Sequence, residues 1–173
     1  MINENRQLEH HEVNFKRNIF PIVIICENIS VPENVGMVFR IADAFGAEKI
    51  YLTGESVQLP NKKIEKTSRS TINFIPHEYV ENTSVLLKKL NEIGYKNIAL
   101  EITTNSIALQ HYKCNVEDKI ALVIGAESKG VSEETLKLVD DSIHIEMFGR
   151  NSSMNVTTAL SVALYEITKR EER

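Results

Sequence analysis

Three short stretches carry the residues whose types and spacing could do chemistry. They are Asn34–Arg40, Gly125–Gly130 and Arg150–Ser153, and each lies where an apolar, strand-like run gives way to a helix. The first N–H groups of a helix have no partner within it, so such a junction can bind the polar groups of a ligand. An ordinary turn with a helix cap produces the same pattern, and the layout alone leaves both interpretations open.

The residue types indicate what that chemistry would be. Arg40 interrupts an otherwise apolar helix and is a fixed cation suited to a phosphate or a developing oxyanion, although a surface arginine is the plain alternative. Gly125 and Gly130 bracket Glu127 and Lys129, and glycine lets a ligand approach the backbone closely. The sequence has no GxGxxG after the first apolar run and no GxxxxGK[ST], which disfavours a dinucleotide Rossmann site and a P-loop.

Hydrophobic periodicity predicts the elements that would position these stretches. Pro21–Cys26 is a continuous apolar run, typical of a strand buried on both faces. Further strands are predicted at Lys49–Leu52, Thr71–Ile75, Asn97–Ile102, Ile120–Ile124 and Ile143–Met147, and helices from Pro32 up to Gly46, over Asn82–Gly94, around Ser132–Val139 and over Val156–Ile167. This alternation predicts an α/β fold with a mostly parallel sheet flanked by helices. The polar loops would then converge beyond the carboxyl ends of the strands, where such sheets bind ligands.

The composition limits the class of protein. A chain of 173 residues with 42% hydrophobic and 25% charged residues predicts a single domain, 1–173, with an N-terminal arm or helix at 1–18. No apolar run is long enough to cross a membrane, and no secretory signal opens the chain. Cys26 and Cys114 form no CxxC, and the histidines show no metal spacing, so we expect a reduced, cytoplasmic protein without metal.

Taken together, the three stretches resemble the motifs of a known family. Asn34-x-Gly36-x-x-x-Arg40, Gly125-x-Glu127-x-x-Gly130 and Ser153-Met154-Asn155-Val156-Thr157, in this order, are similar to the motifs of the SpoU (TrmH-like) RNA 2′-O-methyltransferases of the SPOUT class. The similarity runs from about Pro21 to Ile167. It implies a deep C-terminal trefoil knot, which is a rare exception to unknotted topology. It also implies S-adenosylmethionine as methyl donor, a homodimer, and a tRNA or rRNA substrate recognised without a separate RNA-binding domain.

The resemblance also implies roles for individual residues. Arg40 matches the arginine thought to act on the ribose 2′-hydroxyl, with Asn34 beside it, while Ser153 and Asn155 match the polar pair of the third motif. The implied cofactor-binding residues are Leu100, Glu101, Ile124, Gly125, Glu127, Gly130, Ile145, Met147, Ser153 and Met154. Two departures stand out: Glu146 replaces the usual proline, which could alter the strand end, and Thr157 replaces a frequent serine but keeps the hydroxyl.

The motifs offer no obvious general base among histidines and carboxylates. Arginine is a poor base because it holds its proton strongly. We therefore favour Arg40 as an electrostatic stabiliser of the forming alkoxide, with a substrate phosphate taking the proton. A deprotonated arginine is the alternative that the resemblance itself suggests.

The net charge of −4 argues against a non-specific nucleic-acid coat, so an RNA-binding chain must concentrate its cations locally. The candidate RNA-binding residues are Arg40, Lys62, Lys63, Lys66, Arg69 and Arg150. A solvated loop is the alternative interpretation of Gly54–Ser70. The competing functions are a non-catalytic knotted RNA- or nucleotide-binding factor and a flavodoxin-like signalling domain. The latter would need an acidic pocket after the first strand, which Glu27 alone does not supply.

Overall fold

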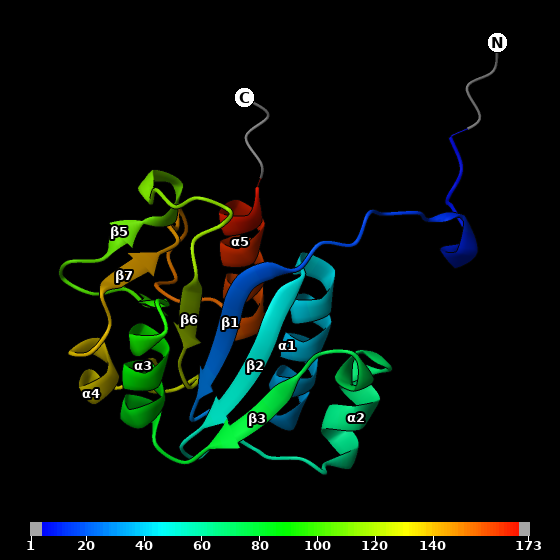
Figure 1. Ribbon diagram of the computed structural model, residues 1–173. Helices are drawn as coiled ribbons and strands as arrows, with labels where there is room; N and C mark the ends of the chain where they lie inside the picture. Colours follow the sequence, from blue (N-terminus) through cyan, green and yellow to red (C-terminus); the bar gives the residue numbers. More distant parts are fainter. Residues whose placement is uncertain (1–4, 170–173) are drawn as a thin grey trace.

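The computed structural model describes residues 5–169, which contain a seven-stranded sheet with helices on both faces (Figure 1). The strands are β1 (Phe20–Glu27), β2 (Ala47–Thr53), β3 (His77–Val80), β4 (Lys96–Leu100), β5 (Ile107–Ala108), β6 (Ile120–Ile124) and β7 (Asp141–His144). The helices are α1 (Pro32–Phe45), α2 (Lys62–Ser68), α3 (Thr83–Glu92), α4 (Glu133–Leu136) and α5 (Val156–Thr168). Three 3₁₀ turns, η1 (His10–Glu12), η2 (Thr71–Asn73) and η3 (Leu109–His111), complete the list, and the predicted α/β class is confirmed.

Every pair of neighbouring strands in the sheet is parallel. The strand order is β3-β2-β1-β6-β4-β7-β5, with β1 and β6 at the centre between β2 and β4. Because the strands are parallel, the carboxyl ends of β1, β4, β6 and β7 all lie at the same end of the sheet. The loops that follow these four strands therefore lie together beyond that end, as the sequence predicts.

The central strand β1 shows how the chain builds two hydrophobic layers. Its alternate side chains point to opposite faces, so Ile22 and Ile24 join one buried cluster and Val23 and Ile25 join the other. Helices α1 and α5 cover the first face and contact each other, whereas α3 covers the second (Figure 1). This two-sided burial explains why β1 reads as a continuous apolar run.

One predicted strand, Thr71–Ile75, is wrong. This segment forms η2, in which the Phe74 N–H donates to the Thr71 carbonyl at 3.0 Å. The Thr71 hydroxyl also donates to the Ser68 carbonyl at 2.6 Å, so local bonds use the groups that a sheet would need. The edge strand β3 follows at His77–Val80 instead.

The polar segment Gly54–Ser70 contains a helix, α2, as well as loop. Asn61 caps its N-terminus, because the Asn61 Oδ1 accepts the Lys63 N–H at 2.9 Å. Ile64 is fully buried against the first hydrophobic cluster and fixes the helix on α1. A short amphipathic helix with a single apolar anchor gives too weak a periodic signal to be recognised from the sequence.

The predicted strand Ile143–Met147 begins two residues earlier than expected and is shorter. Strand β7 spans Asp141–His144, so Ile145 and Met147 lie in the loop beyond its carboxyl end. The sequence also missed β5, which has only two residues and pairs with β7 through Ile107 and Ile143. A strand this short carries no periodicity.

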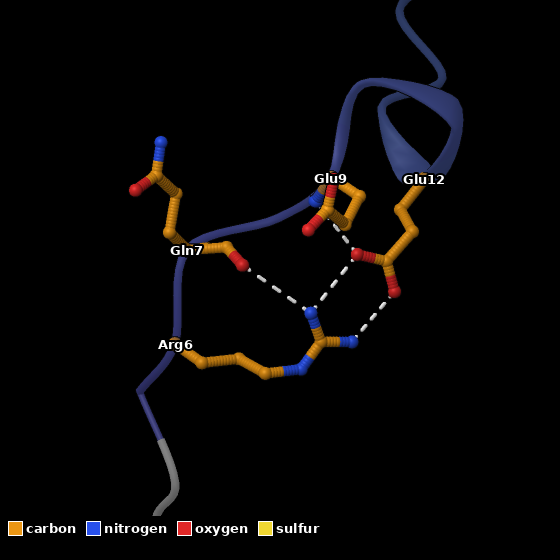
Figure 2. A network of polar contacts seen from close by, with 4 residues as sticks. All are labelled: Arg6, Gln7, Glu9 and Glu12. Carbon is orange, nitrogen blue, oxygen red and sulfur yellow. Dashed lines mark hydrogen bonds and ion pairs between the residues drawn. The ribbon is translucent and has the colours of Figure 1, made fainter.

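Residues 5–19 form an arm that extends away from the sheet (Figure 1). Within it the Arg6 guanidinium donates to both carboxylate oxygens of Glu12, at 2.9 and 2.6 Å, and the Glu9 N–H donates to Glu12 at 2.7 Å (Figure 2). The Arg6–Glu12 hydrogen bonds raise the pKa of Arg6 and lower the pKa of Glu12. Of the arm or helix expected at 1–18, the described part is an arm with one turn, and residues 1–4 lie outside the described residues.

Candidate active site

Hydrogen bonds join the three polar motifs at the carboxyl edge of the sheet. Asn34, in the first turn of α1, donates from its Nδ2 to the Glu127 carboxylate in the loop after β6. Asn155, at the start of α5, donates from its Nδ2 to the Asn34 Oδ1 at 3.4 Å. One residue from each motif thus belongs to a single chain of contacts, although Asn34 and Asn155 are 121 positions apart. The predicted convergence of the loops is confirmed.

The orientation of Asn155 is fixed by its role as the N-cap of α5. Its Oδ1 accepts both the Thr157 N–H at 2.9 Å and the Thr157 hydroxyl at 2.6 Å. With its oxygen occupied in this way, its amide N–H₂ is the part that faces Asn34. The Thr157 hydroxyl, which a serine would also supply, therefore helps to orient the Asn155 side chain toward Asn34.

A cavity of about 410 Å³ lies beside this chain of contacts. It is lined by Leu100, Glu101, Ile102, Ile124, Ala126, Glu127, His144, Ile145, Met147, Ser152, Ser153, Met154, Asn155, Val156 and Ala159. The lining comes from the ends of β4, β6 and β7, the third motif and the first turns of α5. All the residues assigned to a cofactor from the sequence belong to it except Gly125 and Gly130.

The loop after β6 needs glycine at positions 125 and 130 for its own conformation. Gly125 and Gly130 close the loop on itself: the Ala126 N–H donates to the Gly130 carbonyl at 3.1 Å, and the Gly130 N–H donates to the Ala126 carbonyl at 2.8 Å. A Cβ on Gly125 would lie 2.0 Å from the Gly130 carbonyl carbon and 2.2 Å from the Val131 nitrogen. The space that a side chain on Gly125 would need is filled by the loop's own backbone, and neither glycine is among the residues that line the cavity.

Two carboxylates bind the backbone directly after this loop, at Val131 and Ser132. The Glu101 Oε1 accepts the Ile102 N–H at 2.9 Å, and its Oε2 accepts the Val131 N–H at 3.0 Å. Glu27, buried at the end of β1, accepts the N–H and the hydroxyl of Ser132 at 2.8 and 3.0 Å. Sequence reasoning missed this role of Glu27, although a carboxylate directly after a buried apolar strand was the signal that could have found it.

The comparison with known proteins supports this geometry. The model of the SpoU rRNA Methylase family matches residues 21–165. The chain belongs to this family. It is 28% identical over 162 residues to the 23S rRNA (guanosine-2′-O-)-methyltransferase RlmB of Blochmanniella floridana, covering 94% of this chain and 63% of the relative. It is 32% identical over 147 residues to an uncharacterised tRNA/rRNA methyltransferase of Synechocystis, covering 85% of this chain and 38% of the relative.

Solved structures share the fold of this SpoU-family chain. The TrmH/SpoU tRNA modifying enzyme of A. aeolicus superposes with a TM-score of 0.78 at 25% identity, covering 88% of this chain and 76% of that structure. The SpoU methyltransferase AviRb of Streptomyces viridochromogenes, solved with AdoMet, has the same TM-score at 19% identity, covering 92% and 60%, and shows the fold alone. The chain spans less than two thirds of the length of the RlmB and Synechocystis relatives.

His144 is a cavity residue that the family motifs do not contain and that sequence reasoning missed. The His144 Nδ1 lies 2.9 Å from the Ser106 hydroxyl oxygen, which also lies 2.9 Å from the Thr103 carbonyl. This contact holds the imidazole at the end of β7. The position of His144 at the last residue of β7, one residue before Ile145, is the signal that could have identified it.

The thiols are not nucleophiles at this site. Burial raises the pKa of the Cys26 thiol to about 12, and the nearby negative charge of Glu127 adds to the effect. Burial also raises the pKa of Cys114, which is half-buried and does not line the cavity. Among the described residues, no cluster of histidine, cysteine or carboxylate side chains has the arrangement needed for a metal ion.

Arg40 does not line the cavity. It is exposed on α1, and its guanidinium contacts the Met37 sulfur at 3.9 Å. Asn34 and Arg40 are six residues apart, so they lie roughly 9 Å apart along the helix axis. The structure therefore brings Ser153 and Asn155 into the cavity lining and Asn34 into contact with that lining, but leaves the predicted catalytic arginine on the surface.

The predicted cations of α2 lie next to the first motif. Lys63 pairs with Glu33, the neighbour of Asn34, at 3.3 Å. Gly36 of the first motif permits the close packing of α2 against α1, because a Cβ on Gly36 would lie 2.7 Å from the Thr67 Cβ. The other predicted cations on or near this helix, Lys62, Lys66 and Arg69, are exposed, as is Arg150 in the loop after β7.

Proposed function

We propose that the chain is an S-adenosylmethionine-dependent methyltransferase that acts on a ribose 2′-hydroxyl of tRNA or rRNA. The observation that carries this proposal is the hydrogen-bonded contact of Asn34, Glu127 and Asn155, one residue from each family motif, at the rim of a cavity. The names of the relatives, which describe rRNA and tRNA methyltransferases, support the same activity.

The cavity fits the methyl donor in size and chemistry. Its volume of about 410 Å³ lies in the range of about 300–1,000 Å³ typical of small-molecule sites. Leu100, Ile145 and Met147 would hold the adenosine among apolar contacts, while Glu127, Ser153 and Asn155 supply polar groups in the same lining. S-adenosylmethionine supplies a methyl group already activated by a positively charged sulfur.

The residues of the chain then have alignment as their main task. Asn34, held between Glu127 and Asn155, is oriented to position the ribose for in-line attack. With the donor bound in the cavity, its methyl group would pass to the 2′-oxygen and leave S-adenosylhomocysteine, while a phosphate of the RNA takes the 2′-hydroxyl proton. Arg40 stabilises the negative charge that develops on the 2′-oxygen.

RNA is the proposed macromolecular partner. Arg40, Lys62, Lys63, Lys66, Arg69 and Arg150 would contact its phosphates. Buried Ile64 and the close approach of Thr67 to Gly36 support this assignment, because they hold α2 against the first motif. Phosphate contacts position a nucleic acid without reading its sequence, so this surface would serve binding more than selectivity.

We further propose a cytoplasmic homodimer with α5 in the interface. Exposed Val162 and Tyr165 on α5 support this, because both are apolar and lie on a helix whose opposite side is buried. Sedimentation of a monomer at micromolar concentration would contradict it. The family also implies a single domain whose C-terminal segment is knotted. Shrinking the Cα trace of an experimental structure between fixed ends would leave a trefoil if this is so and a straight line if it is not.

The decisive experiment supplies radiolabelled S-adenosylmethionine and RNA from a strain that lacks the gene. We expect label to enter the RNA, and Asn34→Ala to reduce the rate of incorporation. A non-catalytic knotted binding factor, the competing function, would bind the same RNA without transferring label.

A further inference from the structure

One aromatic side chain at the rim of the cavity has no role in the site described so far. Phe148 is 96% exposed, the highest value among the large apolar side chains in the described part of the chain. Its neighbour Met147 lines the cofactor cavity, and the chain re-enters the lining at Ser152. Phe148 therefore lies in a loop whose two ends are both anchored at the cavity.

The same loop forms a second hollow. A space of about 350 Å³ is lined by Met147, Phe148, Gly149, Arg150 and Asn151 alone. The stretch from Met147 to Asn155 contains Arg150 and no carboxylate, so the loop combines a positive charge with an aromatic face. This combination suits a ligand that presents a π-surface and a negative charge together, which a nucleotide does.

We propose that Phe148 stacks on a nucleobase of the RNA substrate while Arg150 contacts an adjacent phosphate, a role that rests on the proposed function. Sequence-tolerant recognition of unpaired nucleotides uses aromatic side chains on which bases stack, next to cations that contact the backbone. A nucleotide drawn to the cavity rim would lose part of the stacking that its base has in the free RNA, and an exposed aromatic ring at the rim would replace it. Phe148 thus stabilises the extruded nucleotide rather than taking part in methyl transfer.

The absence of tryptophan from the sequence allows a direct test. Phe148→Trp introduces the only tryptophan, whose emission can be excited apart from that of the tyrosines, and stacking on a base quenches it. We expect quenching on titration with a short single-stranded oligoribonucleotide of mixed sequence. Ile93→Trp is the matched control, because Ile93 is 60% exposed but precedes β4, at the opposite edge of the sheet from the site. Its emission should not change.

Substitutions that distinguish the aromatic face of Phe148 from its size give the second readout. Phe148→Ala should weaken binding of the oligoribonucleotide by about 5- to 150-fold, the range typical of one lost base–aromatic stack. Phe148→Tyr should bind as the wild type does, whereas Phe148→Leu should resemble Phe148→Ala. Affinity for S-adenosylmethionine should be the same in all of these variants.

Two results would overturn the proposal. Wild-type RNA affinity in Phe148→Leu would show that an aromatic face is not needed. In the second, the emission of Phe148→Trp would not change with RNA but would change with protein concentration, and sedimentation would show that Phe148→Ala no longer dimerises. This result would show that a second copy of the chain covers the residue.

The test separates this inference from the proposed function. A wild-type protein that methylates RNA, with Phe148→Ala unchanged in RNA affinity, would overturn the stacking role alone. A protein whose Phe148→Trp emission is quenched by RNA, but which transfers no methyl group, would overturn the proposed function and leave the stacking role standing.

Discussion

The two sides of the candidate site differ in how completely the chain satisfies its polar groups. On the cavity side, Glu101, Glu127 and Asn155 are all engaged in hydrogen bonds that fix the loops. On the outer side, Arg40 and Arg150 are exposed, and neither has an ion-pair partner within residues 5–169. The first side is preformed for a small ligand of fixed shape, whereas the second is left open for a large ligand that brings its own charges.

The largest effect on donor binding should come from deforming the preformed side. Gly125→Ala places a Cβ within 2.0–2.3 Å of the backbone of Gly130 and Val131, so the loop must move. Overpacking of this kind typically costs about 1–3 kcal/mol, and we expect affinity for S-adenosylmethionine to fall by about tenfold or more. Isothermal titration calorimetry measures it directly.

A matched control exists for this variant. A Cβ on Gly149 would meet no atom within 4 Å, so Gly149→Ala should bind the donor as the wild type does. Equal affinities for Gly125→Ala and the wild type, in a folded protein, would show that the loop does not shape the donor site.

The largest effect on turnover should come from the open side. Arg40→Ala should lower turnover by about 10²- to 10³-fold, as is typical when a group that stabilises developing charge is removed. Donor affinity should not change, because Arg40 is not among the residues that line the cavity. Single-turnover methyl transfer and calorimetry measure the two quantities separately. Equal losses of donor binding and rate would assign Arg40 to the donor side instead.

The sequence predicted the secondary-structure elements of the site better than the contacts between them. Strong hydrophobic runs such as Ile120–Ile124 and the helix ended by Gly46 were predicted because burial and capping leave clear local signals. The family motifs located most cavity residues. The sequence could not show that Gly130 fills the space above Gly125, because that contact depends on the closed loop. It also missed His144, whose partner Ser106 is distant in the sequence.

A smaller effect should follow from removing cations of α2. Replacing Lys62 and Lys66 with alanine should flatten the log–log salt dependence of RNA binding by about 0.7 per lost contact. Lys88→Ala with Lys89→Ala is the charge-matched control on α3, which covers the other face of the sheet. Fluorescence anisotropy at several salt concentrations gives the slopes. If both pairs changed the slope equally, net charge rather than the α2 surface would govern binding.

The smallest effect should come from Thr157, where the chain departs from the family's frequent serine. Thr157→Ser keeps the hydroxyl that donates to Asn155, so turnover should remain within about twofold. Thr157→Val removes that hydrogen bond, typically worth about 0.5–1.5 kcal/mol, and should lower both the melting temperature and the rate. Unchanged kinetics in Thr157→Val would show that the cap does not orient Asn155 for catalysis.

The most direct test of the central claim is the position of the transferred methyl group. RNA methylated with labelled S-adenosylmethionine is hydrolysed in alkali, which cleaves only next to a free 2′-hydroxyl, and the products are identified by mass spectrometry. Transfer to the ribose oxygen predicts label in alkali-stable dinucleotides that yield 2′-O-methylnucleosides. Label confined to mononucleotides with a methylated base, or no label at all in RNA that the protein binds, would contradict the account.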